Sequence, residues 1–210
     1  YEHRLRAASK DDVLPYLEVH SPEGQAYLAD HDWALRYAEL NRERMALAAE
    51  EVLRSVLGVS AAWDSFRQSN HNHLRRENLG SLGSQGSKGS QGLWVHRKGA
   101  LPAHEGVPGV VPGSMGTSSY HVTGRGNVAS LCSSSHGAGR RWSRSEARRN
   151  VSVERLEDQL HGIYYDHRLA HRLRDEAPSA YKDIQKVMRA QRELIRIIRR
   201  LWPLLCYKGG

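Results

Sequence analysis

The feature of this sequence with the clearest chemical potential is a histidine among small residues, in the stretch Ser-Ser-Ser-His-Gly-Ala-Gly-Arg at 133–140. Gly137 and Gly139 lack a Cβ atom, so a phosphate can approach their backbone N–H groups, and Arg140 can neutralise its charge. A neutral imidazole nitrogen of His136 can attack an α-phosphate and give a phosphoramidate. This stretch therefore indicates nucleotidyl transfer, although a single histidine in such a loop is more often an ordinary surface residue.

A second loop, Pro-Gly-Ser-Met-Gly at 112–116, is followed by Thr-Ser-Ser-Tyr at 117–120. It offers backbone N–H groups and several hydroxyls, which suit both anions and the polar edge of a guanine. The same residues are also typical of a simple turn between strands. The loop is a candidate nucleotide contact whose function depends on what lies beside it.

Two imidazoles and two amides lie together in Asn70-His71-Asn72-His73, with Glu77 following. Imidazole and carboxylate ligands suit Mn²⁺, Zn²⁺ or Fe²⁺. One local cluster cannot close a metal shell, so further ligands must come from elsewhere. Only two cysteines occur, without CxxC spacing, and a disulfide framework or a structural zinc site is not expected.

Charge and length bound the class of protein. The chain has 210 residues, enough for one domain or part of one, and a net charge of +8. Residues 1–60 carry 7 basic and 11 acidic side chains, and residues 61–210 carry 24 and 12, so the positive charge lies in the later part. An anionic partner is plausible, but basic residues can also simply maintain solubility. No apolar run approaches the roughly 20 residues of a membrane helix, which favours a cytoplasmic protein.

The helices and strands that must position these residues can be predicted from the spacing of apolar residues and from turn and cap residues. Ser21-Pro22-Glu23 is a good helix start, and apolar residues at helical spacing predict one or two helices over about 22–57 with one buried face. The Gly/Ser repeat at 80–92 is typical of a solvated loop. Short β-prone runs at 93–95, 109–111 and 119–122 predict strands, and apolar spacing over 184–202 predicts a C-terminal amphipathic helix. The expected fold class is α+β.

These motifs, in this order, resemble the RtcB family of RNA-splicing ligases. The resemblance covers nearly the whole chain, and it implies a GTP-dependent and Mn²⁺-dependent ligase that joins RNA 3′-phosphate or 2′,3′-cyclic phosphate ends to 5′-hydroxyl ends. It rests on the following stretches: Gly24–Leu28, Tyr37-Ala38, Asn41-Arg42, His71-Asn72, Val95–Ala100, Pro112–Tyr120, His136–Arg140, Ser143-Arg144, Asp175–Pro178, Tyr181–Ile184 and Lys208-Gly209.

The resemblance also implies a role for individual residues. His136 matches the histidine that becomes guanylylated, and His71 matches a metal-ligating histidine. Tyr181 is implied to stack on the guanine base, and Arg97 and Lys98 to contact RNA phosphates. The residues implied to contact GTP or GMP are Asn72, Pro112, Gly113, Ser114, Met115, Ser119, Gly137, Ala138, Gly139, Tyr181 and Lys208.

The main departure from the family pattern is that the segment supplying an Asp, a Cys and two further His as metal ligands is not in this sequence. We therefore expect a chain that is inactive alone and that depends on a separate N-terminal half for metal ligands. Two alternatives remain open. One is a truncated, non-catalytic remnant that at most binds guanine nucleotide or RNA, and the other is a fragment that does not fold by itself.

Overall fold

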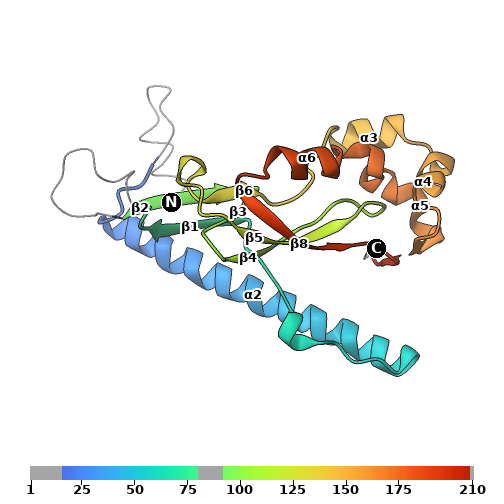
Figure 1. The fold of residues 1–210 in the computed structure, drawn as a ribbon, viewed down its shortest axis with the longest axis horizontal. Helices are drawn as coiled ribbons and strands as arrows, with labels where there is room; N and C mark the ends of the chain where they lie inside the picture. Colours follow the sequence, from blue (N-terminus) through green and yellow to red (C-terminus); the bar gives the residue numbers. More distant parts are fainter. Residues whose placement is uncertain (1–15, 80–91, 209–210) are drawn as a thin grey trace. The chain divides into compact units, whose positions relative to one another are not determined.

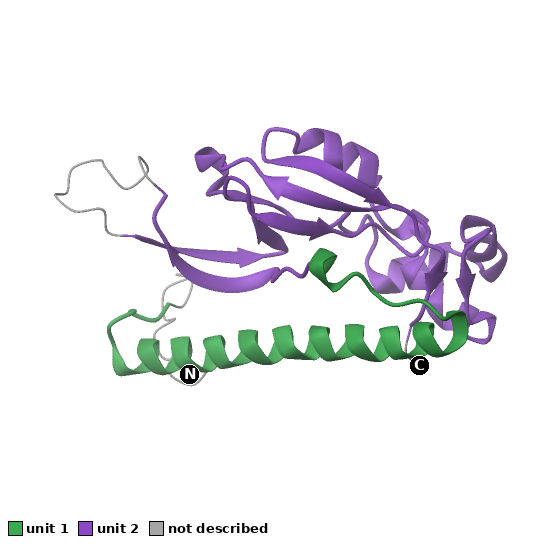
Figure 2. Ribbon diagram, turned by 60° about the horizontal axis from the view of Figure 1, so that its bottom comes forward, with its two compact units in different colours: residues 1–66 green, residues 67–210 purple. Residues whose placement is uncertain are grey.

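The computed structural model describes residues 16–79 and 92–208 of the chain. Within it the chain divides into two compact units, Tyr1–Phe66 and Arg67–Gly210, which Figure 2 colours separately. The predicted Gly/Ser loop lies, apart from Gly92, outside the described residues. All of the candidate site residues belong to the second unit.

The first unit is dominated by one long helix, α2, at Pro22–Leu57 (Figure 1). Ser21 caps it by accepting a hydrogen bond from the Gly24 N–H, and Gly58 ends it in the left-handed conformation, φ 66°. The predicted helix is confirmed. The predicted buried face is not, because only Gly24 of this helix is buried. A 36-residue helix spans about 54 Å, and the short helix η1 at Trp63–Ser65 is too small to cover it.

The second unit contains four small sheets (Figure 1). The strands predicted at 93–95, 109–111 and 119–122 are confirmed. The sheets are β1 (Asn72–Glu77) with β2 (Leu93–Lys98), β3 (Ala100–Pro102) with β6 (Ser133–Ser135), β4 (Pro108–Val111) with β5 (Ser119–Gly124) and β8 (Ile195–Leu201), and β7 (Tyr164–Tyr165) with β9 (Leu205–Cys206). Among the strand pairs of the described residues, only β7–β9 is parallel.

Short helices fill most of the sequence between β5 and β8. They are η3 (Val128–Ser130), α3 (Arg144–Asn150), α4 (Val153–Gln159), η4 (His167–Leu169), α5 (Ala170–Leu173), η5 (Arg174–Glu176), η6 (Pro178–Ala180) and α6 (Ile184–Ala190). Ser143 begins α3 with a reciprocal capping box to Glu146. The mixture of helices and strands agrees with the expected α+β class.

The predicted C-terminal helix over 184–202 is wrong. Helix α6 ends at Ala190, and residues 195–201 form β8, which pairs with β5. The apolar spacing fitted a helix, but β-branched Ile195, Ile197 and Ile198 favour a strand, and β5 supplies pairing partners for Ile195 and Ile197. Gln191 follows the helix, and its side-chain oxygen accepts hydrogen bonds from the N–H and hydroxyl of Ser135.

The two larger of the three apolar clusters among the described residues hold most of the second unit together. In the first, β3, β4, β5 and the start of β8 pack against α6, through Leu101, Val111, Val122, Met188 and Ile195. The second gathers residues from α4, α5 and β7 with Met115. The loop after Val111 leaves β4, and the loop at 136–140 leaves β6, which pairs with β3, so the positions of both loops depend on that core.

A buried ion pair fixes β2 to β1. Arg97 is only 2% exposed and donates two hydrogen bonds to the Glu77 carboxylate, at 2.5 and 2.8 Å. It also donates to the carbonyls of Leu131 and Cys132. The expectation that Arg97 contacts RNA phosphates is therefore wrong, because its guanidinium is enclosed by protein acceptors. Lys98, the next residue, is exposed.

Among the described residues, none of the helices combines the length and the apolar character needed to cross a membrane.

We predict that Glu77→Gln destabilises the protein by about 3 kcal/mol at neutral pH, because a buried guanidinium loses its counter-charge. Burial by itself would raise the pKa of Glu77, but hydrogen bonding and charge from Arg97 and His104 outweigh it and hold this pKa below its usual 4.5. The stabilisation is therefore present above that value and is lost as the pH falls through the folded-state pKa. Thermal unfolding from pH 7 to pH 3 measures it.

The matched control is Glu193→Gln, whose carboxyl is 76% exposed beside Arg192. It should change the melting temperature little at any pH. A Glu77→Gln protein as stable as wild type at pH 7 would show that the pair does not hold β1 and β2 together.

Candidate active site around His136

The placement of His136 follows from strand pairing. It comes directly after β6, and Gly99 comes directly before β3, and these two strands pair antiparallel with Ala100 opposite Ser135. The pairing brings Gly99 to His136, whose backbone N–H donates to the Gly99 carbonyl at 3.3 Å. Gly99 has φ +71°, a conformation that L side chains rarely adopt.

The ring of His136 is oriented by the same carbonyl. Its Nδ1 lies 2.6 Å from the Gly99 oxygen. A carbonyl oxygen can only accept, so Nδ1 carries the proton, and in the neutral ring the lone pair is on Nε2. His136 is half-buried. The hydrogen bond to Gly99 therefore defines which ring nitrogen points away from the backbone, namely Nε2.

His71 meets His136 at this point. It immediately precedes β1, and its carbonyl accepts a hydrogen bond from the Gly99 N–H at 2.7 Å. The two imidazole rings pack edge to face, with centroids 4.8 Å apart and an interplanar angle of 88°. Asn72, the first residue of β1, is exposed beside His71 and pairs with Lys98. The structure thus brings together the residues predicted from sequence as metal ligand and nucleophile, 65 positions apart.

The loop at 112–119 contacts the histidine loop through its first residue. The Pro112 carbonyl accepts from the Ala138 N–H at 3.1 Å, and a Cβ added to Gly137 would lie 3.1 Å from the same oxygen. Gly137 and Ala138 are buried, whereas Gly139 is exposed. The residues of the two loops that were predicted to contact a nucleotide are therefore adjacent in space.

The inner residues of the loop at 112–119 have fewer groups free to contact a nucleotide than the sequence suggested. The N–H groups of Gly113 and Ser114 donate to the Ser119 and Thr117 hydroxyls at 3.4 and 2.7 Å. Met115 is only 5% exposed and packs in the second apolar cluster. Its side chain cannot reach a nucleotide at the surface, so the contact predicted for Met115 is limited to its backbone.

A second group of predicted residues surrounds Glu176. Its carboxylate accepts from the Tyr181 hydroxyl at 2.5 Å and from Arg140 at 2.7 Å, and Lys208 Nζ lies 3.7 Å away. The Arg140 guanidinium also lies over the Tyr181 ring, 4.7 Å from its centroid. Arg140 was expected to neutralise a phosphate, but here its charge is balanced by Glu176.

Burial, followed by the hydrogen bond to the Glu176 carboxylate, raises the pKa of Tyr181 to about 12. The phenol is therefore protonated throughout the neutral range and donates to Glu176. The backbone links this group to the histidine loop, since the Lys182 N–H donates to the Gly139 carbonyl at 2.9 Å. The aromatic ring has a fixed position next to residues 136–140.

Comparison with known proteins decides the family. A sequence profile described as tRNA-splicing ligase RtcB matches residues 2–209. The chain belongs to the RtcB family. It is 37% identical over 197 residues to RNA-splicing ligase RtcB1 of Escherichia coli, which covers 89% of this chain and 45% of that protein.

Two further RtcB relatives also match nearly the whole of this chain. RNA-splicing ligase RtcB of Mycobacterium tuberculosis is 35% identical over 223 residues, with 98% of this chain and 50% of that protein covered. tRNA-splicing ligase RtcB of Pyrococcus furiosus is 31% identical over 226 residues, with 95% and 22% covered. This chain therefore spans half or less of the length of these curated relatives.

Three residues with clear positions in this RtcB site were not assigned a role from sequence. Gly99 contacts both His71 and His136. Glu176 contacts Arg140, Tyr181 and Lys208. Gln191 accepts hydrogen bonds from Ser135, the residue before His136. Gly99 and Glu176 do lie in the stretches that carried the resemblance, which was the available signal. Gln191 gave none, because its partner is 56 residues away.

The described residues do not by themselves form a closed metal centre. No group of three or more His, Cys, Asp or Glu side chains lies close enough together to hold an ion in residues 16–79 and 92–208. His71 provides one imidazole next to His136. We therefore derive no chemical step that passes through a metal ion.

We predict that long-range ¹H–¹⁵N spectra at pH 8 show His136 as the tautomer protonated at Nδ1, because only a donor satisfies the Gly99 carbonyl at 2.6 Å. His136→Ala assigns the signal. In Gly99→Ala the left-handed backbone costs about 1–2 kcal/mol, and the ring should then show a mixture of tautomers. A wild-type ring protonated mainly at Nε2 would contradict this orientation.

Proposed function

We propose that this chain carries the guanylate-accepting histidine of a GTP-dependent RNA ligase that joins 3′-phosphate or 2′,3′-cyclic phosphate ends to 5′-hydroxyl ends. The observation that carries the proposal is His136, held with Nδ1–H on the Gly99 carbonyl and packed against His71. Family membership supports RNA splicing as the class of reaction, since the relatives are named RNA-splicing or tRNA-splicing ligases.

The geometry of His136 suits covalent transfer of GMP. The Nε2 lone pair forms a bond to the α-phosphorus of GTP while the bond to the β-phosphate oxygen breaks, and pyrophosphate leaves. The ring then bears a positive charge, which the Nδ1–H bond to the Gly99 carbonyl stabilises. No general base is required, because the attacking nitrogen already has a free lone pair.

The later steps use the phosphoramidate as an activated donor. An oxygen of the RNA 3′-phosphate attacks the guanylate phosphorus, the P–N bond breaks, and His136 returns to its neutral form. The 5′-hydroxyl of the second RNA end then attacks the activated 3′-phosphate, a phosphodiester forms, and GMP leaves. Activation is needed because a bare phosphate oxygen is a poor leaving group.

We assign binding of the guanine base to the residues around Glu176. A carboxylate can accept from the N–H groups of a guanine edge, a lysine such as Lys208 can donate to its carbonyl, and the Tyr181 ring offers a stacking surface. Glu176 lies within 3.7 Å of Lys208 and 2.5 Å of the Tyr181 hydroxyl. Backbone groups of 137–139 and of the Pro112 loop, together with Asn72, would then hold the rest of the nucleotide.

For Mn²⁺ we propose His71 as a ligand. The described residues do not complete the shell, and the relatives are about twice as long or more. The remaining ligands are therefore proposed to come from a segment equivalent to the other half of those relatives, in the same polypeptide or in a separate one. The substrate partner is RNA with 3′-phosphate and 5′-hydroxyl ends.

We predict that the chain, mixed with Mn²⁺, α-labelled GTP and the N-terminal half of the Escherichia coli relative, acquires one covalent GMP on His136. His136→Ala should lower labelling at least 100-fold, because no other residue supplies this nitrogen. Intact mass and peptide mapping give the site. The chain without the added half should label weakly or not at all.

His161→Ala is the matched control, since that histidine is exposed and lies outside the site. It should label like wild type. Labelling of His136→Ala at an unchanged level would remove the proposed nucleophile. A folded chain that takes no label in either mixture would favour the alternative of a non-catalytic remnant.

A further inference from the structure

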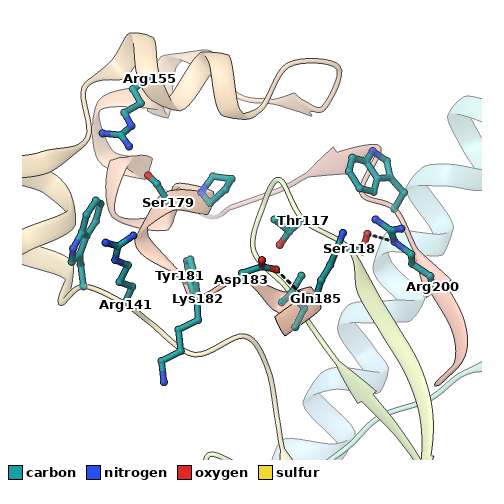
Figure 3. Close-up of a pocket in the computed structure, with 14 residues that line it drawn as sticks. Thr117, Ser118, Arg141, Arg155, Ser179, Tyr181, Lys182, Asp183, Gln185 and Arg200 are labelled. Carbon is teal, nitrogen blue, oxygen red and sulfur yellow. Dashed lines mark hydrogen bonds between the residues drawn. The ribbon is translucent and has the colours of Figure 1, made fainter. Parts of the chain in front are cut away.

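A pocket of about 640 Å³ opens beside the histidine loop, within the second unit (Figure 3). We call it the basic pocket. Its chemistry comes from six side chains that belong to distant parts of the sequence: Arg141, Trp142, Arg155, Lys182, Arg200 and Trp202. None of them belongs to the residues assigned above to GTP.

Positive charge dominates this pocket. Among the described residues, none of its four cations forms an ion pair, and Arg141, Arg155 and Lys182 are exposed. The one carboxylate in the lining, Asp183, accepts from the N–H groups of Gln185 and Lys186 at the start of α6. Cations that line one pocket without an ion-pair partner create a site for several phosphate charges.

Each of two indoles in the pocket has a guanidinium beside it. Arg141 lies 5.4 Å from the Trp142 ring centroid, and Arg200 lies 5.6 Å from that of Trp202. Arg200 is oriented by a 2.7 Å hydrogen bond from Nε to the Ser118 hydroxyl, visible in Figure 3. Trp202 is 60% exposed. Trp142, by contrast, is half-buried and packs against the second apolar cluster. An exposed indole face next to a cation, as at Trp202, is a surface on which a nucleobase can stack.

A hydroxyl in the lining has no partner of its own. Ser179 Oγ is buried and makes no hydrogen bond with the described residues. Buried polar atoms are nearly always paired. A ligand acceptor would pair with this hydroxyl only if the Ser179 side chain turned toward the pocket.

The wall of the pocket is continuous with the histidine loop. The N–H groups of Arg141 and Trp142 both donate to the Ala180 carbonyl, at 2.8 and 3.2 Å. Tyr181 lines the pocket and also forms part of the group around Glu176. A polymer bound in the pocket would therefore lie next to residues 136–140.

We propose that the basic pocket binds consecutive nucleotides of single-stranded RNA next to the end that is to be joined. This inference rests on the proposed ligase function for the identity of that end. A strand fits better than a free nucleotide, because the four cations and the exposed indole of Trp202 come from different segments and spread phosphate contacts and base stacking over the pocket. The backbone phosphates match the additional cations Arg155 and Lys182.

The test is binding of a fluorescein-labelled ten-nucleotide oligouridylate to the 210-residue chain, measured by anisotropy at several KCl concentrations without GTP or Mn²⁺. Arg141→Ala/Arg155→Ala should weaken binding about tenfold and reduce the salt slope by about 1.4, at roughly 0.7 per lost phosphate contact. Trp202→Ala should weaken binding at least about fivefold with little change of slope, as expected for lost stacking.

The matched control is Arg189→Ala/Arg192→Ala, which removes the same charge from exposed positions outside the pocket. Circular dichroism and melting confirm that each variant is folded. If the control pair weakens binding as much as the pocket pair, attraction is only through net charge and the proposal is wrong. Lys182→Ala, an exposed single change, repeats the test if the double variant does not fold.

Unlabelled GTP distinguishes a strand from a free nucleotide. Millimolar GTP should leave the RNA bound, whereas displacement at micromolar GTP would make this a mononucleotide pocket and overturn the assignment to RNA. The assay needs no guanylylation, so a chain that takes no GMP can still bind RNA through the pocket. A chain that is labelled on His136 but does not bind RNA here would reject only this inference.

Discussion

The backbone N–H and carbonyl of Gly99 are the constraint on which the arrangement at His136 depends. Its carbonyl accepts from both the backbone and the ring of His136, and its N–H donates to the carbonyl of His71. One residue thereby fixes the position of two histidines and the tautomer of one. Its left-handed conformation, φ +71°, is what turns the chain from β2 into β3 and allows both contacts.

The rest of the site is organised around charge balance at Glu176. A single carboxylate engages Arg140, the Tyr181 phenol and Lys208, and each comes from a different segment. The group joins the His136 region through main-chain hydrogen bonds between residues 139–142 and 180–182. The histidine and the aromatic ring are thus held by backbone pairing, which is more rigid than contact between long side chains.

Features that depend on neighbouring residues could be predicted from the sequence, whereas features that depend on contacts between distant residues could not. The long helix was predictable because Ser21 and Gly58 cap it locally, and the strands at 93–95 and 119–122 because their β-branched and aromatic content is local as well. Residues 195–201 were misread as helix because only pairing with β5 distinguishes their apolar spacing from a helical one. The burial of Arg97 could not be predicted from the sequence either, because its hydrogen-bond partners lie 20 to 35 residues away.

The same division applies to the candidate site. Motif order identified His136, His71 and the residues of both loops, but it could not show that Met115 faces a core or that Arg140 is neutralised by Glu176. Those facts depend on which side chains meet after folding. The basic pocket is another case, because its arginines and tryptophans come from positions 141 to 202 and form no sequence motif.

Strand β8 has a further consequence for the behaviour of the protein in solution. It is the terminal strand of the β4-β5-β8 sheet, so one of its edges carries backbone groups that a strand of another molecule could pair with. Arg196, Arg199 and Arg200 are all exposed along it. Two copies of such a strand repel each other when they approach edge to edge. Positive charge on an end strand opposes edge-to-edge pairing of two copies, to which the β-branched isoleucines of this strand would otherwise be prone.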